Sequence, residues 1–251
     1  MATISNSIWL TGDVHHMSMK GTDHLLLSKK NIKTTEVDLC DPYLEICNQY
    51  GFKPTLFFTG KSIEQESKKI QKLISKYKFN IGGHTFATYQ PTLFSKFSRK
   101  LFGSPYYSKQ NQYNDIIKTK NIINKKLGDK IKYWRNHAYQ FDKYTNNILS
   151  QEGFTRVSNI VDTKLNFIEK ISNNLFSYPI NTLPDHENLP HSIEHKNQID
   201  PNIWLSKNIK YVKNIINHDG TPTLLLHPLC MFLEDNFSFM IKLLSKLSKY
   251  N

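Results

Sequence analysis

Short apolar runs alternate with longer amphipathic stretches along this chain. The apolar runs are rich in β-branched and aromatic residues, which is typical of buried strands. Between them, apolar residues recur at helical spacing, as in 61–77. This alternation predicts an α/β fold in which helices cover a parallel sheet, within one domain spanning 1–251. The seven runs lie at 8–10, 54–60, 79–83, 131–134, 155–158, 175–180 and 222–226.

Turn and capping residues predict where the intervening segments begin and end. Asp41 is a good N-cap and Pro42 a good first helical residue, so a helix is expected to begin there. The stretch 85–107 is irregular and rich in aromatic residues and serine, and we expect it to be a long loop near the site. The pattern is weakest between 163 and 195, where 184–187 is expected to be a polar loop.

Polar residues fall repeatedly at the ends of the predicted strands. Asp13 and His15 follow the first strand, and His84, Arg135 and His227 each follow a later one. In a closed or nearly closed barrel of parallel strands, these ends share one face, where such folds assemble their sites. A single histidine at a strand end is usually structural, but four strand ends with such residues predict a common site. A carboxylate and imidazoles there could bind a divalent metal and hold a base beside it.

Composition and charge change this picture little. Lys and Arg number 33 against 21 Asp and Glu, which gives a net charge of +12. Such an excess of positive charge could bind nucleic acid, an anionic membrane or a phosphorylated substrate. The excess is mostly scattered lysine, in a chain also rich in Asn and Ile, so a solvated surface is the favoured interpretation. We therefore predict no specific nucleic-acid partner.

Cysteine usage and apolar stretches bear on the compartment. Cys40, Cys47 and Cys230 show no metal-type spacing, and their odd number favours reduced thiols. The first residues lack a basic region followed by an apolar run, and no stretch is apolar enough to span a membrane. A cytoplasmic protein without a transmembrane segment is expected, of unknown oligomeric state.

The residues at the strand ends also lie in motifs that resemble the polysaccharide deacetylase family, carbohydrate esterase family four. The resemblance runs in order over nearly the whole chain and implies a distorted (β/α) barrel that removes acetyl groups from sugars with a bound metal. The family motifs TFDDG (or a DxD variant), ATFFVTG, IGSHTxxH, FRAPxxS and LxLHP are matched by Thr11–His15, Pro54–Gly60, Ile81–Thr85, Trp134–Tyr139 and Leu224–Pro228.

The resemblance implies catalytic roles for four residues. Asp13 matches the base that deprotonates the attacking water, and Arg135 would orient it by a charge-assisted hydrogen bond. His227 matches the general acid that protonates the leaving amine. Tyr139, in the third motif, is expected to bind substrate.

The metal ligands depart from the family pattern. His84 matches the first metal-binding histidine, and His15 stands where the DxD branches place a metal-binding carboxylate. The second histidine of the family, four residues after the first, is Thr88 here. Because a catalytic zinc site usually has three protein ligands, another must be recruited or the metal is absent. The metal would be zinc, with cobalt or nickel as alternatives, and the candidate ligands are His16, His137, and His186 or Asp185.

Together these features predict a metal-dependent hydrolase that removes an N-acetyl or N-formyl group from an amino sugar. A nucleotide-linked or lipid-linked intermediate of surface-glycan synthesis is the favoured substrate, because its phosphates would suit the basic charge. A non-sugar amide remains open. The alternative is a degenerate deacetylase-like protein that binds a glycan or a partner, and Thr88 and His15 motivate it.

Overall fold

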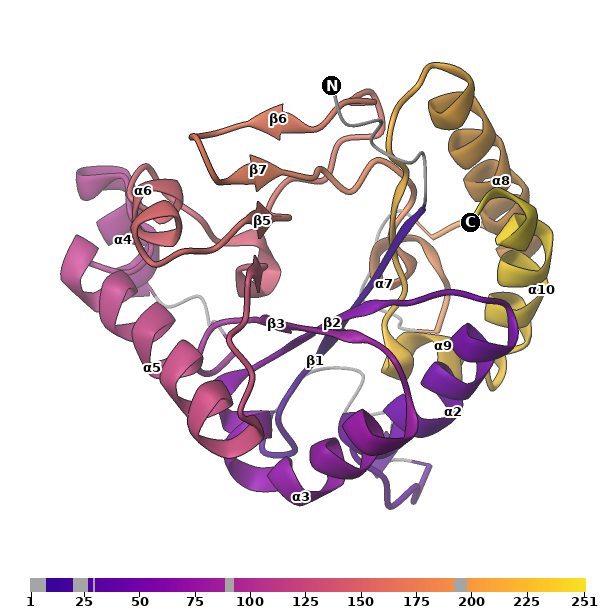
Figure 1. Ribbon diagram of the computed structural model, residues 1–251, viewed down its shortest axis with the longest axis horizontal. Helices are drawn as coiled ribbons and strands as arrows, with labels where there is room; N and C mark the ends of the chain where they lie inside the picture. The colour runs from indigo at the N-terminus through magenta and orange to yellow at the C-terminus, as the bar shows by residue number, and fades with distance from the viewer. Residues whose placement is uncertain (1–7, 20–26, 29, 89–92, 192–197) are drawn as a thin grey trace.

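The computed structural model describes residues 8–19, 27–28, 30–88, 93–191 and 198–251. One curled sheet runs through it, with the strand order β6-β7-β5-β4-β3-β2-β1-β8 (Figure 1). Seven strands are parallel, which confirms the predicted parallel fold, and β6 pairs antiparallel with β7. The strands are β1 (Trp9–Val14), β2 (Thr55–Phe58), β3 (Asn80–Gly83), β4 (Tyr133–Trp134), β5 (Arg156–Val157), β6 (Glu169–Lys170), β7 (Phe176–Ser177) and β8 (Thr223–Leu225).

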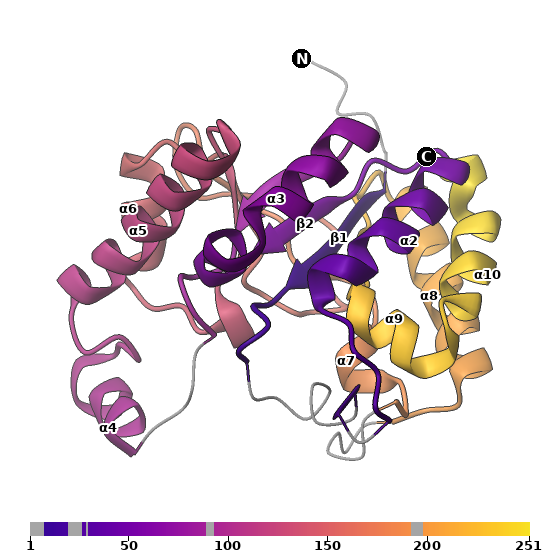
Figure 2. The same cartoon turned by 90° about the horizontal axis from the view of Figure 1, so that it is seen from below.

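The longer helices surround the sheet, as two perpendicular views show (Figures 1 and 2). The α-helices described are α2 (Glu36–Gln49), α3 (Gly60–Lys76), α4 (Leu93–Phe102), α5 (Lys109–Leu127), α6 (Thr145–Gln151), α7 (Asp185–Asn188), α8 (Pro201–Asn217), α9 (Pro228–Asp235) and α10 (Ser238–Leu247). Short 3₁₀ turns lie at His137–Tyr139 and Ser248–Tyr250. Within the described ranges, no helix combines the length and the apolar character that a membrane crossing requires.

The strand register brings the carboxyl ends of four strands to one level. Val14 is paired with Phe58, Phe58 with Gly83, and Gly83 with Trp134. The residues that follow β1, β3 and β4 therefore leave the sheet side by side. On the other side of β1, Leu225 is paired with Thr11, so the residue two positions further on is level with the carboxyl end of β1.

The far edge of β8 is joined to the chain after β7 by side chains. The Thr223 backbone N–H donates to Asn181 Oδ1 at 2.8 Å. The Thr182 hydroxyl donates to the Thr223 carbonyl at 3.0 Å. These bonds satisfy backbone groups of an edge strand that has no ladder partner on that side. The sheet is thus a distorted barrel that side chains, instead of a ninth strand, help to close.

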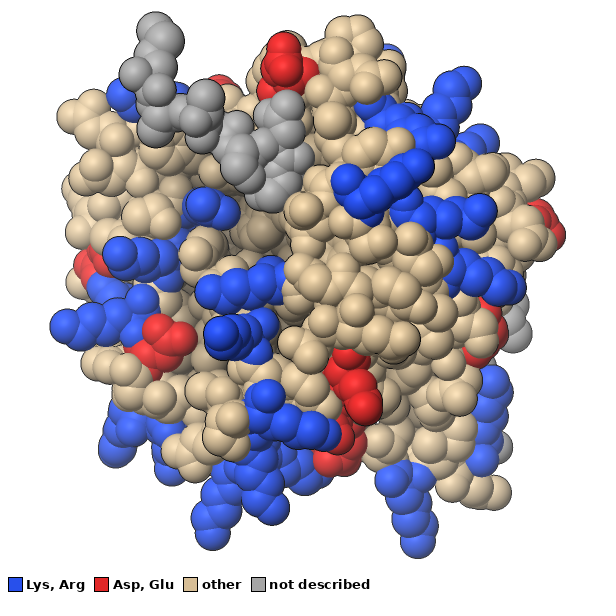
Figure 3. Space-filling view, turned by 45° about the vertical axis from the view of Figure 1, so that its right-hand side comes forward, with Lys and Arg blue, Asp and Glu red and all other residues tan. Residues whose placement is uncertain are grey.

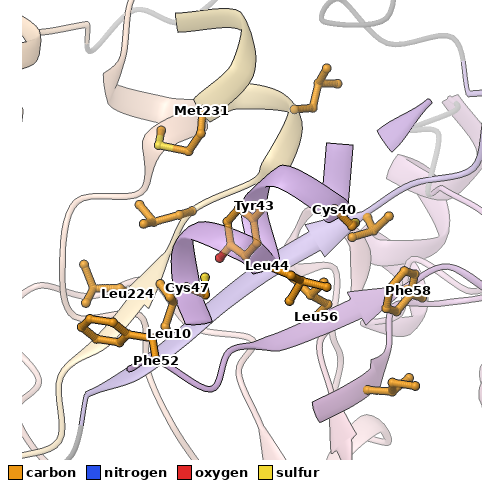
Figure 4. Packing of buried hydrophobic residues seen from close by; sticks show 14 of the residues in the cluster. Leu10, Cys40, Tyr43, Leu44, Cys47, Phe52, Leu56, Phe58, Leu224 and Met231 are labelled. Carbon is orange, nitrogen blue, oxygen red and sulfur yellow. The ribbon is translucent and has the colours of Figure 1, made fainter. Parts of the chain in front are cut away.

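A dense apolar layer fixes α2 on the central strands (Figure 4). Leu10, Leu56 and Leu224 come from three neighbouring strands, and Tyr43 and Leu44 come from α2. All five are at most 1% exposed. Burying a side chain of this size stabilises the fold by roughly 1.5–3 kcal/mol. This packing anchors β1, the strand that carries Asp13 and is followed by His15.

The predicted start of α2 was wrong by six residues. The helix begins at Glu36, where Thr35 is the N-cap and forms a capping box with Asp38. Pro42 therefore lies inside the helix instead of at its first position. The two donors satisfied at Thr35 and Asp38 favour the earlier start, and packing of α2 compensates the hydrogen bond that Pro42 cannot donate.

Two predicted loops contain helices. The stretch 85–107 was expected to be irregular, but α4 occupies 93–102, and 89–92 lie outside the described residues. The polar stretch expected at 184–187 forms most of the short helix α7, and Asp185 is its first residue. Both helices lie between recognisable strands, where the weak sequence pattern gave no helical signal.

Positive charge is spread over the surface. Figure 3 shows lysine and arginine side chains over most of one face, with few acidic side chains between them. The distribution fits the predicted solvated surface.

Candidate active site

Asp13 lies near the end of β1 and is held by a buried guanidinium. Arg135 Nη1 donates to Asp13 Oδ1 at 2.8 Å, and Nη2 donates to the Thr11 hydroxyl at 2.9 Å. The same side chain donates to both the carbonyl and the hydroxyl of Ser158. Because Arg135 is fully buried and has several fixed partners, it orients the Asp13 carboxylate rigidly.

Charged neighbours keep Asp13 ionised. Burial raises the pKa of the Asp13 carboxyl, but Arg135, His84 and His227 together lower that pKa well below its usual range. The second carboxylate oxygen, Oδ2, lies 3.7 Å from His84 Nε2 and 3.6 Å from His227 Nε2. Asp13 therefore presents one anchored oxygen and one oxygen that faces two imidazoles.

His227 is held between two carboxylates. Asp185 Oδ1 lies 2.7 Å from His227 Nδ1, and Asp185 Oδ2 accepts the His227 backbone N–H. Burial lowers the pKa of His227, but Asp185 and Asp13 outweigh it and raise that pKa to about 10. Burial likewise raises the pKa of Asp185, yet His227 and His186 bring it below its usual range. The result is an imidazolium that can donate a proton from Nε2 toward the space beside Asp13.

Three histidines gather beside Asp13, from the ends of β1, β3 and β4. The ring centroids are 5.2 Å apart for His15 and His84, 5.0 Å for His15 and His137, and 5.3 Å for His84 and His137. One nitrogen of each ring lies within 4.8 Å of the others. Burial, with neighbouring histidines, lowers the pKa of His137 and brings the pKa of His84 to about 3. Three imidazoles at this separation fit a three-histidine zinc site.

Two of these rings have their outer nitrogen fixed. His84 Nδ1 lies 2.9 Å from the Arg135 carbonyl, so it donates there and leaves Nε2 with a lone pair. His15 Nδ1 lies 3.1 Å from the Glu36 carboxylate, which also accepts the His15 backbone N–H at 2.7 Å. Such partners set the tautomer and ring direction of metal-binding histidines.

Glu36 did not emerge from the sequence as a site residue. It is buried as the first residue of α2, and its contact with His15 depends on where that helix begins. The capping box of Thr35 and Asp38 was the signal that could have placed it. Asp185 had been considered only as a metal ligand, whereas the structure places it against His227.

His16 and His186 lie outside the three-histidine group. His16 Nδ1 is 2.9 Å from the Ser18 hydroxyl, and its Nε2 is 3.4 Å from the Thr88 hydroxyl. The ring centroid of His186 lies 4.8 Å from that of His227, and His186 is not a member of the group. Asp185 and His227 also form a group with the thiol of Cys230, but their imidazole and carboxylate already bond to each other.

Tyr139 reaches the same region from the turn after β4. Its ring lies 6.0 Å from that of His186. Its hydroxyl is buried and has no hydrogen-bond partner among the described residues. Burial raises the pKa of this phenol well above its usual range, so the hydroxyl stays protonated and can donate a hydrogen bond. A buried donor without a partner is costly unless a ligand accepts from it.

Comparison with known proteins assigns the chain to a family. The family model for polysaccharide deacetylase matches residues 22–157, just over half of the chain. A search of curated proteins found no match. Among solved structures, a protein from Mycobacterium smegmatis described as a polysaccharide deacetylase has a TM-score of 0.71 at 12% identity, over 99% of this chain and 86% of that one.

Two further structures share the fold. The Puue allantoinase has a TM-score of 0.70 at 10% identity, over 96% of this chain and 84% of that chain. A carbohydrate esterase family four pseudoenzyme from Bacillus anthracis has a TM-score of 0.55 at 13% identity, over 99% of this chain and 61% of that chain. These likenesses concern the fold, while the match to the family model covers residues that include His84 and Arg135. The chain therefore belongs to the polysaccharide deacetylase family.

Proposed function

We propose that this protein is a metal-dependent hydrolase that removes an N-acetyl or N-formyl group from an amino sugar. The observation that carries the proposal is the position of Asp13 Oδ2, 3.6 Å from His227 Nε2 and 3.7 Å from His84 Nε2. A carboxylate, an imidazolium and a group of three further imidazoles thus meet at one point. This is the combination that hydrolysis of an amide requires.

His15, His84 and His137 are the residues that would hold the metal. The separation of the three rings and the fixed outer nitrogens of His15 and His84 fit a zinc site with three protein ligands, with cobalt or nickel as substitutes. In this assignment His137 supplies the ligand that Thr88 cannot. The metal, when bound, polarises the acyl carbonyl and lowers the pKa of a bound water.

Asp13 and His227 would move the protons. Asp13 takes a proton from water as the water oxygen bonds to the acyl carbon, while Arg135 keeps the carboxylate in place. As the C–N bond breaks, His227 gives its proton to the amine nitrogen, which leaves a free amino sugar and a carboxylic acid. The proton on Asp13 can then return to His227 across the 3.6 Å that separates them. Tyr139 would donate to the substrate from its buried hydroxyl.

The favoured substrate is a nucleotide-linked or lipid-linked sugar of surface-glycan synthesis, processed in the cytoplasm. The net charge of +12 would attract its phosphates. Three free, buried cysteines support a reducing compartment.

Release of acetate or formate from nucleotide-linked N-acyl amino sugars tests the proposal. The parent should release acid, treatment with a chelator should stop release, and zinc or cobalt should restore it. Asp13→Ala and His227→Ala should lose release, while His218→Ala, an exposed histidine at the end of α8, should not. Equal release by parent and Asp13→Ala would refute the assignment.

A binding protein without hydrolysis is the second candidate, favoured by Thr88 at the position of a family ligand. Elemental analysis of protein purified without added metal separates the two. About one zinc per chain supports the enzyme. Sub-stoichiometric metal, with no gain on adding zinc, cobalt or nickel, supports the binding protein.

A further inference from the structure

Helix α4 carries apolar side chains that no other part of the described chain covers. Phe97 is 60% exposed and Leu101 is 56% exposed, and they lie one turn apart on the same helix face. Tyr107 and Phe141 nearby are 49% and 39% exposed. We call these four residues the rim patch. Single exposed apolar residues are ordinary, but several together mark an interaction surface.

Hydrogen bonds connect the rim patch to the active site. Arg99 of α4 donates to the Gln140 side chain at 2.5 Å, and the Tyr106 hydroxyl donates to the Gln140 carbonyl at 2.6 Å. Asn136 in turn donates to the Tyr106 hydroxyl at 2.6 Å, and His137 follows it in the chain. In Figure 2, α4 projects at the lower left, beyond the end toward which the β1 arrow points. The patch therefore borders the edge of the barrel at which the site opens.

The segment that carries Phe97, Leu101 and Tyr107 has charge of one sign, whereas Phe141 is followed by Asp142. From Phe86 to Asn114 the chain contains three lysines and one arginine but no acidic residue. Arg99 and Lys100 are exposed and lie between Phe97 and Leu101 in the sequence of α4. Helices that lie on anionic membranes combine an apolar face with flanking basic residues in this way. A protein partner of ordinary composition would not require this absence of acidic side chains.

The exposed side chain of Phe167 lacks this combination of apolar and purely basic neighbours. Phe167 is 68% exposed, but Asp162 and Glu169 stand near it in the chain. The neighbouring Asn166 carbonyl lies against Gly220, which precedes β8, so this residue belongs to the opposite end of the barrel.

We propose that the rim patch docks on an anionic lipid bilayer, with Phe97 and Leu101 entering the interface and Arg99 and Lys100 meeting the headgroups. This inference rests on the proposed deacylation. It favours a lipid-linked substrate over a nucleotide-linked one. A sugar joined by phosphate to a membrane lipid would be presented at the edge of the barrel where the site opens.

Flotation with vesicles of equimolar phosphatidylcholine and phosphatidylglycerol tests the docking surface. The parent should float with these vesicles and much less with phosphatidylcholine alone. The variant Phe97→Ser/Leu101→Ser should have a vesicle partition coefficient at least about tenfold lower than that of the parent. Two apolar side chains are then no longer transferred from water into the bilayer interface. Lys100→Gln should also weaken binding, whereas Phe167→Ser, the matched control, should bind as the parent does.

Other results overturn the proposal. The proposal is wrong if the parent does not float, or if the Phe97→Ser/Leu101→Ser variant floats as well as the parent. It is also wrong if sedimentation shows that the parent is a dimer and that this variant is a monomer. The last result would assign the patch to a second copy of the chain. Asp13→Asn must still float, and both surface variants must still hydrolyse a soluble substrate if the parent does. Loss of flotation and loss of hydrolysis are thus read separately.

Discussion

Glu36 holds His15 at two points, accepting its backbone N–H at 2.7 Å and lying 3.1 Å from its ring Nδ1. The carboxylate thereby fixes both the course of the chain after β1 and the direction of the imidazole. If His15 is a metal ligand, Glu36 acts through it as a positioning residue.

Glu36→Gln should weaken metal binding by about 10- to 100-fold, because the neutral amide no longer makes His15 a more basic ligand. Competition with a chromogenic chelator measures this directly, without reference to activity. Glu45→Gln, an exposed change on the same helix, should leave the affinity unaltered. Equal affinities for parent and Glu36→Gln would remove His15 from the ligand set.

His137→Ala should abolish stoichiometric zinc binding, since two histidines hold the metal poorly. Thr88→Ala should retain it, because the hydroxyl of Thr88 contacts His16 and not the three-histidine group. Calorimetric titration with zinc distinguishes the two variants. If Thr88→Ala lost zinc and His137→Ala kept it, the assignment of the third ligand would be wrong.

Asp185→Asn should shift the pH dependence of hydrolysis. In the parent, His227 stays protonated up to its pKa of about 10, so kcat should fall only above that pH. Without the Asp185 charge the pKa of His227 drops, the proton is lost at lower pH, and the falling limb moves toward neutrality. The rate should also decrease by about 10²- to 10⁴-fold. Glu187→Gln on the same short helix should keep the parental profile, and an unshifted limb in Asp185→Asn would contradict the role of His227.

Arg135→Met should destabilise the fold by about 3–5 kcal/mol, because it leaves the Asp13 carboxylate buried without its partner. The double variant Asp13→Asn/Arg135→Met should recover part of this loss, since no buried charge then remains. Urea unfolding of the parent and the two variants at neutral pH measures both effects. A single variant as stable as the parent would show that the pair does not constrain the fold.

The same ion pair predicts how stability depends on acid. The pKa of Asp13 lies below its unfolded value of about 4, so its contribution is present above pH 4 and is lost as pH falls below that value. Asp13→Asn should reduce this acid sensitivity. Free energies of unfolding measured at intervals of about 1 pH unit between pH 3 and pH 7 would reveal the difference between the parent and Asp13→Asn.

Much of the site could be predicted because its residues adjoin strong local signals. Asp13, His84, Arg135 and His227 lie in or directly after apolar strands, and parallel strands bring their carboxyl ends together. His137 was one of several open candidates, since no local pattern distinguished it from His16 or His186. Only the spatial positions of the three rings separate them.

The parts that sequence did not predict depend on contacts distant in the chain. Glu36 meets His15 across 21 residues, and Asp185 meets His227 across 42. Strand β6, unlike β7 within the predicted run 175–180, was not expected, because two exposed residues are too few for an alternating pattern. The start of α2 was mispredicted for a different reason. Asp41 and Pro42 form a local pattern that is typical of a helix start, but a capping box begins the helix earlier, at Thr35.

The level alignment of Val14, Phe58, Gly83 and Trp134 has an evolutionary consequence. Side chains that leave neighbouring strands at the same height point into a common volume, so a coordinating group lost from one loop can be replaced from the next. Under the proposed assignment, the imidazole of His137 after β4 would take the place of the second histidine that the family motif has after β3. A barrel built this way can exchange its coordinating residues while its reaction centre stays in place.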